Sequence, residues 1–203
     1  MIPIKLEWKR CQDGVDIFDT SKHGNPYEGP FARPRSKRFE PVTYDIPNLE
    51  NPIAVSFANI RNETDALAFI NRYGMPADVP EVSLEATAFA ARQIRKLLVA
   101  ANETDKVRRA NRALEDVRLT PAFDQDGPGG TARLVLYPAS LSELVQMEIA
   151  FAHEVGAQLG TCQHCRKHFL TGPLTGRRSS AVYCSDRCRV AAARKRNAQT
   201  GVR

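Results

Sequence analysis

The sequence lacks long apolar runs. No stretch approaches the ~20 consecutive apolar residues that a membrane-spanning helix needs. The first residues, Met1 to Trp8, also lack the basic region and apolar core of a secretion signal. Cysteine is scarce, with five among 203 residues, and an odd number without an export signal argues against a disulfide scaffold. We therefore expect a cytoplasmic protein with no membrane partner.

Acidic residues are nearly missing from the C-terminal end of the chain. Residues 160–203 contain ten basic residues and one acidic residue, whereas residues 1–159 contain 19 basic and 22 acidic residues, a net charge of −3. A mildly acidic body with a strongly basic tail indicates a polyanionic partner for the tail, usually a nucleic acid. The alternative is a solvated basic tail that has no specific partner.

Hydrophobic residues make up 42% of the chain, enough for the core of one domain of ordinary size plus a small module. We expect three parts, at residues 1–52, 53–159 and 160–203. In the first part, alternating apolar residues around a turn at Gln12 to Gly14 predict an N-terminal β-hairpin over residues 4–19. Six of the thirteen prolines lie between Ser21 and Pro52, which predicts a Pro-rich, extended surface segment there.

Residues 53–159 predict a mostly helical body with a small β component. Short strands are expected over 53–57 and 131–137, with a loop over 124–130. Helices are expected over 62–73 with Asn62 or Thr64 as the cap, after Ser83, after Thr104, and over 140–159. Together these elements predict an α+β fold.

Apart from Cys11, the cysteines cluster near the C-terminus as Cys162-x2-Cys165 and Cys184-x3-Cys188, with eighteen residues between the two pairs. Zinc prefers four soft or borderline ligands at tetrahedral corners, and four thiolates in two closely spaced pairs supply them. The pattern predicts one Zn²⁺ bound by Cys162, Cys165, Cys184 and Cys188. The alternative is four unrelated buried thiols. His164 or His168 could replace a cysteine, but both are better interpreted as neighbours of the site.

The spacing within residues 160–203 predicts a treble-clef-like zinc module. The first cysteine pair fits a tight turn, Gly172 and Gly176 bound a second hairpin, and the last pair fits the start of a helix. After Cys188 this helix is rich in alanine and arginine, which suits a phosphate backbone better than a protein interior. The predicted nucleic-acid contacts are Arg177, Arg178, Arg187, Arg189, Arg194, Lys195 and Arg196.

Catalytic patterns are incomplete. His153-Glu154 resembles the start of a zinc-protease helix, but Ala157 stands where the second histidine is required. Residues 127–130 are rich in glycine but lack the lysine and Ser/Thr of a phosphate-binding loop. Asp124 and Asp126 are not followed by the glutamate of a calcium loop. We therefore expect a protein that is not an enzyme.

The C-terminal motifs resemble those of a known family. Cys162-Gln-His-Cys165 with Phe169, then Arg177-Arg178, Tyr183-Cys184-Ser185 and Cys188, resemble a CGNR-type zinc finger, and Phe57-Ala-Asn59 before a capped helix resembles the start of an ABATE domain. The resemblance spans residues 53–200 and implies a cytoplasmic bacterial protein regarded as a stress-linked transcription regulator. The Cys-Gly-Asn-Arg signature itself is degenerate here, because Arg189, Val190 and Ala191 follow Cys188.

These features favour a zinc-dependent protein that regulates transcription by binding DNA, most simply duplex DNA, through its C-terminal module. The body would then sense a signal or form a homodimer, and the sequence leaves both alternatives open. A second interpretation is a zinc-stabilised interaction module whose basic tail binds an acidic protein. RNA is a weaker candidate, because the module offers only Phe169 and Tyr183 for base stacking.

Overall fold

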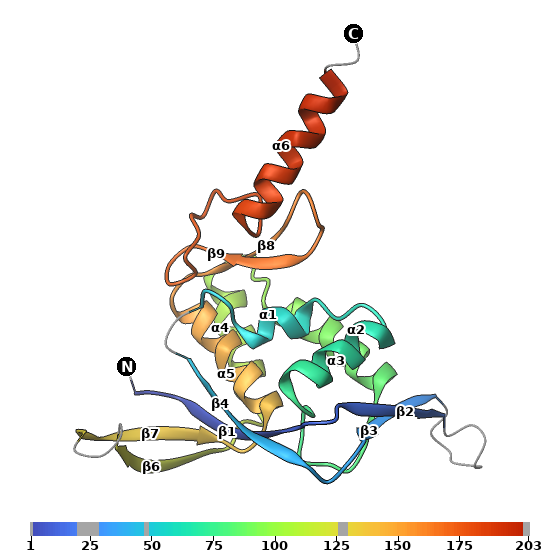
Figure 1. Ribbon diagram of the computed structural model, residues 1–203. Coiled ribbons are helices and arrows are strands. Elements are labelled where there is room, and N and C mark those ends of the chain that lie inside the picture. Colours follow the sequence, from blue (N-terminus) through green and yellow to red (C-terminus); the bar gives the residue numbers. More distant parts are fainter. Residues whose placement is uncertain (1, 20–28, 47–48, 126–129, 201–203) are drawn as a thin grey trace.

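The computed structural model describes residues 2–19, 29–46, 49–125 and 130–200, with six helices and nine strands in these ranges (Figure 1). The strands are β1 (Lys5–Cys11), β2 (Val15–Asp19), β3 (Pro30–Pro34), β4 (Phe39–Asp45), β5 (Val82–Ser83), β6 (Leu119–Gln125), β7 (Ala132–Pro138), β8 (Gln158–Thr161) and β9 (His168–Thr171). The helices are α1 (Ile53–Ala58), α2 (Glu63–Tyr73), α3 (Leu84–Leu97), α4 (Glu103–Leu114), α5 (Leu141–Glu154) and α6 (Asp186–Thr200). This mixture confirms the α+β class. Within the described ranges, no helix has the length and apolar character needed to cross a membrane.

The N-terminal strands form a long, bent ribbon, so the predicted hairpin over residues 4–19 is wrong in its pairing. β1 pairs antiparallel with β4, ending with Cys11 opposite Phe39, and β2 pairs antiparallel with β3. Between the two pairs, the Gly14 carbonyl accepts a hydrogen bond from the Arg35 N–H at 3.0 Å. The turn after β1 therefore does not fold β2 back onto β1. Both strands pair instead with the returning segment that contains β3 and β4.

Within residues 21–52, β3 and β4 are extended as predicted, but they are paired with other strands rather than lying alone on the surface. Pro30 and Pro34 lie at the two ends of β3, and Pro41 lies in β4, which belongs to a two-stranded sheet. A residue without an N–H group is tolerated at such ends and edges. Pro26, Pro47 and residues 126–129 of the predicted loop lie outside the described ranges.

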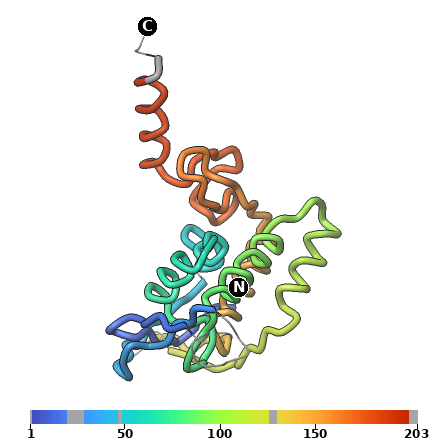
Figure 2. Tube along the Cα trace, turned by 90° about the vertical axis from the view of Figure 1, so that its right-hand side faces the viewer, coloured from blue at the N-terminus to red at the C-terminus, as the bar shows by residue number. Residues whose placement is uncertain are grey.

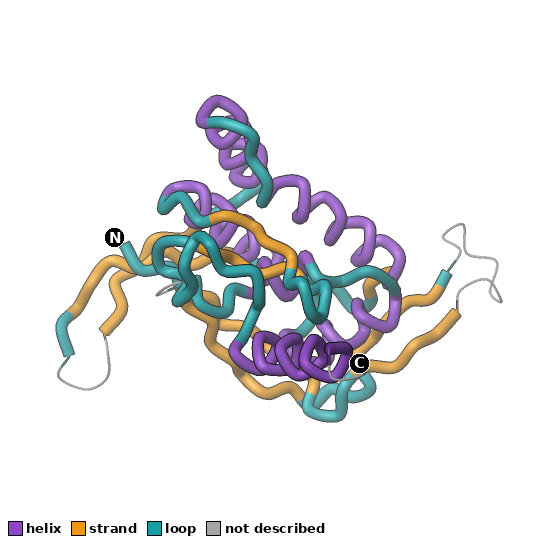
Figure 3. Tube along the Cα trace, turned by 90° about the horizontal axis from the view of Figure 1, so that it is seen from above, coloured by secondary structure: helices purple, strands orange, loops and turns teal. Residues whose placement is uncertain are grey.

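Two strand pairs extend to opposite sides of the helices (Figure 3). One is β2–β3, which continues into β5, and the other is β6–β7, which pair antiparallel along their whole length. An isolated parallel bridge between Ile4 and Leu136 connects the start of β1 to β7. The predicted strand over 131–137 is confirmed as β7.

Residues 53–57, predicted as a strand, form helix α1. Pro52 precedes the helix and offers no side-chain cap. Instead, the buried Glu148 carboxylate on α5 accepts the backbone N–H groups of Ile53 at 3.0 Å and of Ala54 at 2.5 Å. A tertiary contact thus satisfies the free donors of the first helical turn, which a local pattern cannot reveal.

The other body helices begin close to their predicted caps. Asn62, Ser83 and Ser140 accept backbone N–H groups at the starts of α2, α3 and α5. Asn102 caps α4, so the prediction of Thr104 is wrong by two residues. Helix α5 ends at Glu154 rather than Leu159, because the chain turns at Gly156, with φ 73°, into β8.

One hydrophobic core joins the ribbon to α1, α2, α3 and α5. Leu6 from β1 is buried together with Leu84, Leu144 and Ile149 from the helices. Phe57 of α1 and Phe69 of α2 meet edge to face, with 5.0 Å between ring centroids. This core fixes α1, on which the C-terminal residues are supported.

Candidate metal centre

The first cysteine pair lies in the turn of a β-hairpin made by β8 and β9. Thr161 pairs with His168 at the end of this hairpin. The turn is closed by hydrogen bonds from Cys162 N–H to Lys167 O and from Arg166 N–H to Cys162 O, both 2.9 Å. Arg166 adopts φ 63°, a left-handed conformation that completes the tight turn. This geometry turns both thiols toward the second cysteine pair.

The second pair lies at the start of α6. The Ser185 hydroxyl accepts the Cys188 N–H at 3.3 Å, and the Ser185 carbonyl accepts the Arg189 N–H at 3.1 Å. Ser185 therefore caps the helix, with Cys184 just before it and Cys188 in its first turn. A further hydrogen bond, from Gln163 N–H to Val182 O at 3.0 Å, joins the two cysteine segments.

The four sulfur atoms form one cluster. All lie within 4.8 Å of one another, with 3.6 Å between the Sγ atoms of Cys165 and Cys184 and 3.5 Å between those of Cys184 and Cys188. These separations are far longer than the ~2.05 Å of a disulfide bond. Four thiols at such distances can hold a single metal ion, as the sequence predicts for these four positions.

The electrostatics of the cluster favour a bound cation. Burial and the neighbouring thiols raise the pKa of Cys184 to about 12. Burial also opposes ionisation of Cys162, but backbone hydrogen bonds from Cys165, Cys184 and His164 lower its pKa to about 6. Sulfur atoms this close carry several negative charges only when a cation neutralises them.

The hairpin predicted between the two cysteine pairs is present only in its shortest form, as a tight turn without strands of its own. Gly172 and Arg177 make a single antiparallel bridge, and the fully buried Thr175 hydroxyl donates to the Gly172 carbonyl at 2.7 Å. Gly176, with φ 66°, lies against Glu50, where a Cβ atom would stand only 3.3 Å from the Glu50 Cγ. The loop is thus shaped to contact the body.

Asn59, at the end of α1, connects the cysteine-bearing hairpin to the body. Its side-chain oxygen accepts the His168 N–H at 2.7 Å, and its amide donates to the carbonyls of His168 at 3.0 Å and Val55 at 2.9 Å. Arg61 adds a hydrogen bond to the Arg166 carbonyl at 2.5 Å. These bonds place the first cysteine pair directly beyond the end of α1.

Arg177, predicted as a nucleic-acid contact, directs its guanidinium into the protein. Its Nε donates to the Cys184 carbonyl at 2.9 Å, and its Nη1 donates to the Glu50 carbonyl at 2.9 Å. The guanidinium also lies 5.9 Å from the centre of the buried Phe169 ring. Arg177 therefore connects the second cysteine pair to the body and to the hairpin.

The remaining predicted contacts lie on the surface. The exposed residues of this group are Arg178, Arg187, Arg189, Arg194, Lys195 and Arg196. Arg189 forms an ion pair with Asp186 at 3.1 Å, and Arg196 donates to the Tyr183 hydroxyl at 2.9 Å. Five of the six belong to α6, which projects from the cysteine cluster away from the body (Figures 1 and 2).

The two histidines near the site have separate environments. His164 is exposed, and the His168 ring is hydrogen-bonded to Thr161 at 3.2 Å. Burial, together with Arg95 and Arg61, lowers the pKa of His168. Among the described residues, the sulfur cluster includes neither ring.

Sequence reasoning missed the residues that dock the cluster onto the body. Asn59 was visible only as part of the Phe57-x-Asn59 pattern, and Arg95 had no visible role. Arg95 donates to the carbonyls of Ala58 at 2.6 Å and Ile60 at 2.9 Å, which holds the end of α1 in place. No short-range signal identifies these partners, because the bonds of Asn59 to His168 and of Arg95 to Ala58 and Ile60 connect segments distant in the chain.

Comparison with protein-family models and with curated proteins identifies no relative of this chain. No protein-family model matches the chain, and no curated protein matches it. The candidate site is therefore defined by its own geometry, a cluster of four cysteines fixed between the body and an exposed basic helix.

Proposed function

We propose that the chain is a zinc-dependent DNA-binding protein rather than an enzyme. Zinc suits an all-sulfur set, and Zn–S bonds of about 2.3 Å in a tetrahedron require sulfur atoms about 3.8 Å apart. The sulfur separations of 3.5 and 3.6 Å are close to that value. A hairpin turn that carries two ligands and a helix start that carries two more are also typical of a treble-clef module.

The observation that carries the DNA-binding proposal is helix α6. It begins at the cysteine cluster and lies apart from the body (Figure 1). Its arginine and lysine side chains are exposed. Its small alanines, Ala191 to Ala193, leave the helix thin enough to lie against a phosphate backbone or in a groove. A buried structural helix would need an apolar face, and Val190 on α6 is 41% exposed.

The basic residues of α6 fall on two faces. Arg187 and Arg194 are seven residues apart and share a face, because a helix turns about 100° per residue. Lys195 lies at the edge of that face, about 80° from Arg187 around the helix axis. Arg189 and Arg196 share another face and contact Asp186 and Tyr183. We assign phosphate binding mainly to the first face and to Arg178 on the preceding loop, whereas Arg177 supports the module from within.

The resemblance to proteins with an ABATE domain and a CGNR-type finger extends this proposal to transcription regulation. Phe57 and Asn59, which carry the upstream part of that resemblance, lie on α1 and at its end, and Asn59 contacts the cysteine hairpin. The chain would then be a transcription regulator whose body presents the DNA-binding module. A homodimer through the body would supply two such modules.

A salt titration tests DNA binding. Each phosphate that a protein neutralises adds about 0.9 to the slope of log affinity against log salt. Replacing Arg187, Arg194 and Lys195 together with alanine should therefore flatten this slope by about two to three units on duplex DNA. Alanine preserves helix propensity, and the three substitutions leave the Arg189 and Arg196 contacts in place.

A matched control removes the same charge from the body, by replacing Lys106, Arg108 and Arg112 on α4 with alanine. The control should keep the wild-type slope, and metal analysis should give the same metal content in all three proteins. Failure of the wild-type protein to bind duplex DNA at low salt contradicts the proposal. Weak DNA binding that disappears at physiological salt, together with capture of an acidic protein that depends on Arg187 and Arg194, would favour a protein partner.

A further inference from the structure

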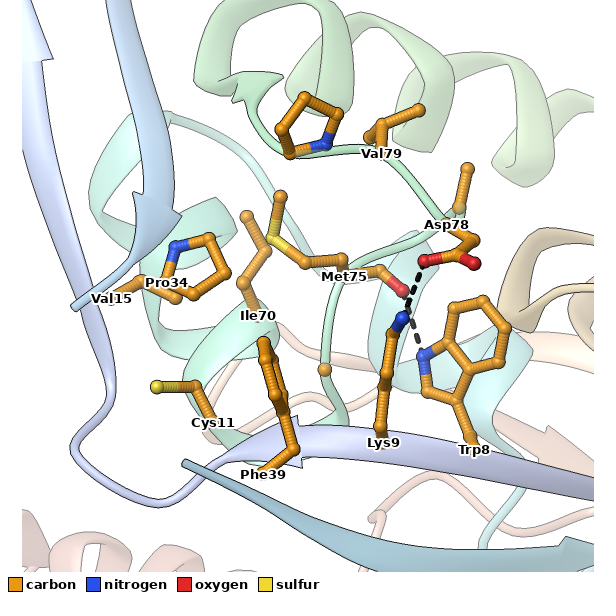
Figure 4. A pocket seen from close by; sticks show the side chains of 13 residues that line it. Trp8, Lys9, Cys11, Val15, Pro34, Phe39, Ile70, Met75, Asp78 and Val79 are labelled. Carbon is orange, nitrogen blue, oxygen red and sulfur yellow. Dashed lines mark hydrogen bonds and ion pairs between the residues drawn. The ribbon is translucent and has the colours of Figure 1, made fainter. Parts of the chain in front are cut away.

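A cavity of about 240 Å³ lies in the N-terminal body, away from the cysteine cluster. Its wall combines β1, the end of α2 and the loop over residues 74–80. Figure 4 shows the side chains of Cys11, Phe39, Ile70 and Met75 around the same space. Most of the lining groups are apolar, and the aliphatic part of the wall also includes Val15, Pro34, Val79 and Pro80.

The loop that closes the cavity is held in a defined position. Gly74 has φ 96°, and a Cβ atom there would stand 2.7 Å from the Lys9 carbonyl and 3.0 Å from the Trp8 indole. Only glycine permits this close approach of the loop to β1. The Pro76 carbonyl further along accepts the Ser142 N–H of α5 at 2.9 Å, so the loop is tied to the core as well.

The polar groups around the cavity are already paired with one another. The Trp8 indole N–H donates to the Met75 carbonyl at 3.0 Å, and the Lys9 ammonium pairs with Asp78 at 2.7 Å (Figure 4). The Cys11 thiol donates to the Ser36 carbonyl at 3.6 Å. In the described part of the chain, no buried side-chain nitrogen or oxygen lacks a hydrogen-bond partner. A ligand in this space would therefore meet apolar surface and no unsatisfied charge.

From these contacts we propose that the cavity binds a small, neutral aromatic molecule. An engineered apolar cavity of about 150 Å³ binds benzene, so a space of this size accommodates about ten non-hydrogen atoms. Aromatic rings pack well against other aromatic side chains and against a flexible thioether, and Trp8, Phe39 and Met75 line this cavity. A charged ligand is disfavoured, because Lys9 and Asp78 neutralise each other at the rim.

The chain supplies its own probe for this site. Trp8 is the only tryptophan, and it lines the cavity. Titration of the whole, zinc-supplemented protein with 4-fluorotoluene should change the fluorescence emission of Trp8. It should also broaden and shift the fluorine NMR signal of 4-fluorotoluene, and the two signals should follow the same saturation curve. For a ligand of this size we expect a Kd in the micromolar to low-millimolar range.

Two matched substitutions locate the site. Val79→Phe adds bulk to the cavity wall, whereas Val190→Phe makes the same change on α6, at nearly equal exposure of 42% and 41%. Because both positions are partly exposed, both variants should fold. Val79→Phe should weaken binding of 4-fluorotoluene at least tenfold, and Val190→Phe should leave it unchanged.

A third measurement does not depend on a variant. Cys11 lines the cavity, so saturating 4-fluorotoluene should slow its modification by N-ethylmaleimide several-fold, as measured on the Cys11 peptide by mass spectrometry. Constant Trp8 emission up to the solubility limit of the probe would overturn the proposal. Equal binding by folded Val79→Phe and wild type, or an unchanged rate at Cys11, would overturn it as well.

Discussion

The body and the cysteine module differ in what holds them together. The large core cluster consists of residues from the body, and among described residues after Ala157 only Leu170 belongs to it. The module buries Cys162, Phe169, Thr171 and Thr175 in addition, which is too little apolar surface to fold alone. Apolar burial therefore stabilises the body, whereas the module relies on hydrogen bonds to α1 and, under the proposed function, on a metal bound by its four cysteines.

The largest expected effect is loss of the metal. Cys184→Ser removes the thiol that lies 3.6 Å from the Cys165 sulfur and 3.5 Å from the Cys188 sulfur. Metal affinity should therefore collapse, and residues 158–200 should lose protection from amide exchange. The body should keep its cooperative unfolding transition, because its core does not include the sulfur cluster. Elemental analysis of the wild-type protein should give one zinc per chain.

The matched control for this prediction is Cys11→Ser, which changes the cysteine that lies outside the cluster. This variant should retain its zinc and its protection pattern. A Cys184→Ser protein that still binds one zinc per chain, or a wild-type protein without zinc, would contradict the assignment of the ligands.

A smaller effect, confined to the stability of the body, is expected when a side chain of its core is truncated. Leu144 on α5 is fully buried, so Leu144→Ala should lower the free energy of unfolding by roughly 2–5 kcal/mol in a denaturant titration. The zinc content should not change. Leu114→Ala makes the same change on α4 at a site that is 37% exposed, and it should cost less than about 1 kcal/mol. Equal losses in the two variants would contradict the position of the core.

The buried carboxyl at the start of α1 should make body stability depend on pH. Burial raises the pKa of Glu148 from 4.5 to about 7, although hydrogen bonds from Ala54 and Ile53 oppose the shift. The folded state thus binds this proton more tightly, and stability should fall as the pH rises from 4.5 to about 7, by roughly 3 kcal/mol at most.

Glu148→Gln tests this dependence, because it keeps a carbonyl acceptor for one N–H group and removes the titration. The free energy of unfolding of the wild type minus that of the variant should decrease between pH 4.5 and about 7 and stay constant above. Parallel pH profiles of the two proteins would show that Glu148 does not titrate as described.

Sequence reasoning succeeded where the signal is local. Asn62, Ser83 and Ser140 cap helices within three residues of themselves, and the cysteine spacing identifies a cluster whose sulfur atoms lie within 4.8 Å. Such signals need no knowledge of the rest of the chain. The start of α2 and the composition of the candidate site could therefore be predicted.

The failures share a physical cause, which is contact between distant segments. Residues 53–57 became helical through Glu148, about 95 positions away, and the N-terminal strands paired with residues 30–45 instead of with each other. Arg177 looks like a surface cation in the sequence, but carbonyls of Glu50 and Cys184 take up its guanidinium. Alternation and composition do not report which distant group satisfies a donor.

The most local expected effect concerns the docking of the module on the body. Asn59→Ala removes the three hydrogen bonds to His168 and Val55, which contribute about 1 kcal/mol each. Amide exchange at His168 should therefore accelerate, while zinc content and the unfolding midpoint of the body change little. Asn62→Ala is the matched control, because it removes a helix cap worth about 1 kcal/mol from α2 in the body. It should lower body stability and leave the His168 amide protected. If instead Asn59→Ala leaves that amide as protected as in the wild type, Asn59 is not what docks the module, and the contacts of Arg61 with Arg166 and of Arg177 with Glu50 are sufficient.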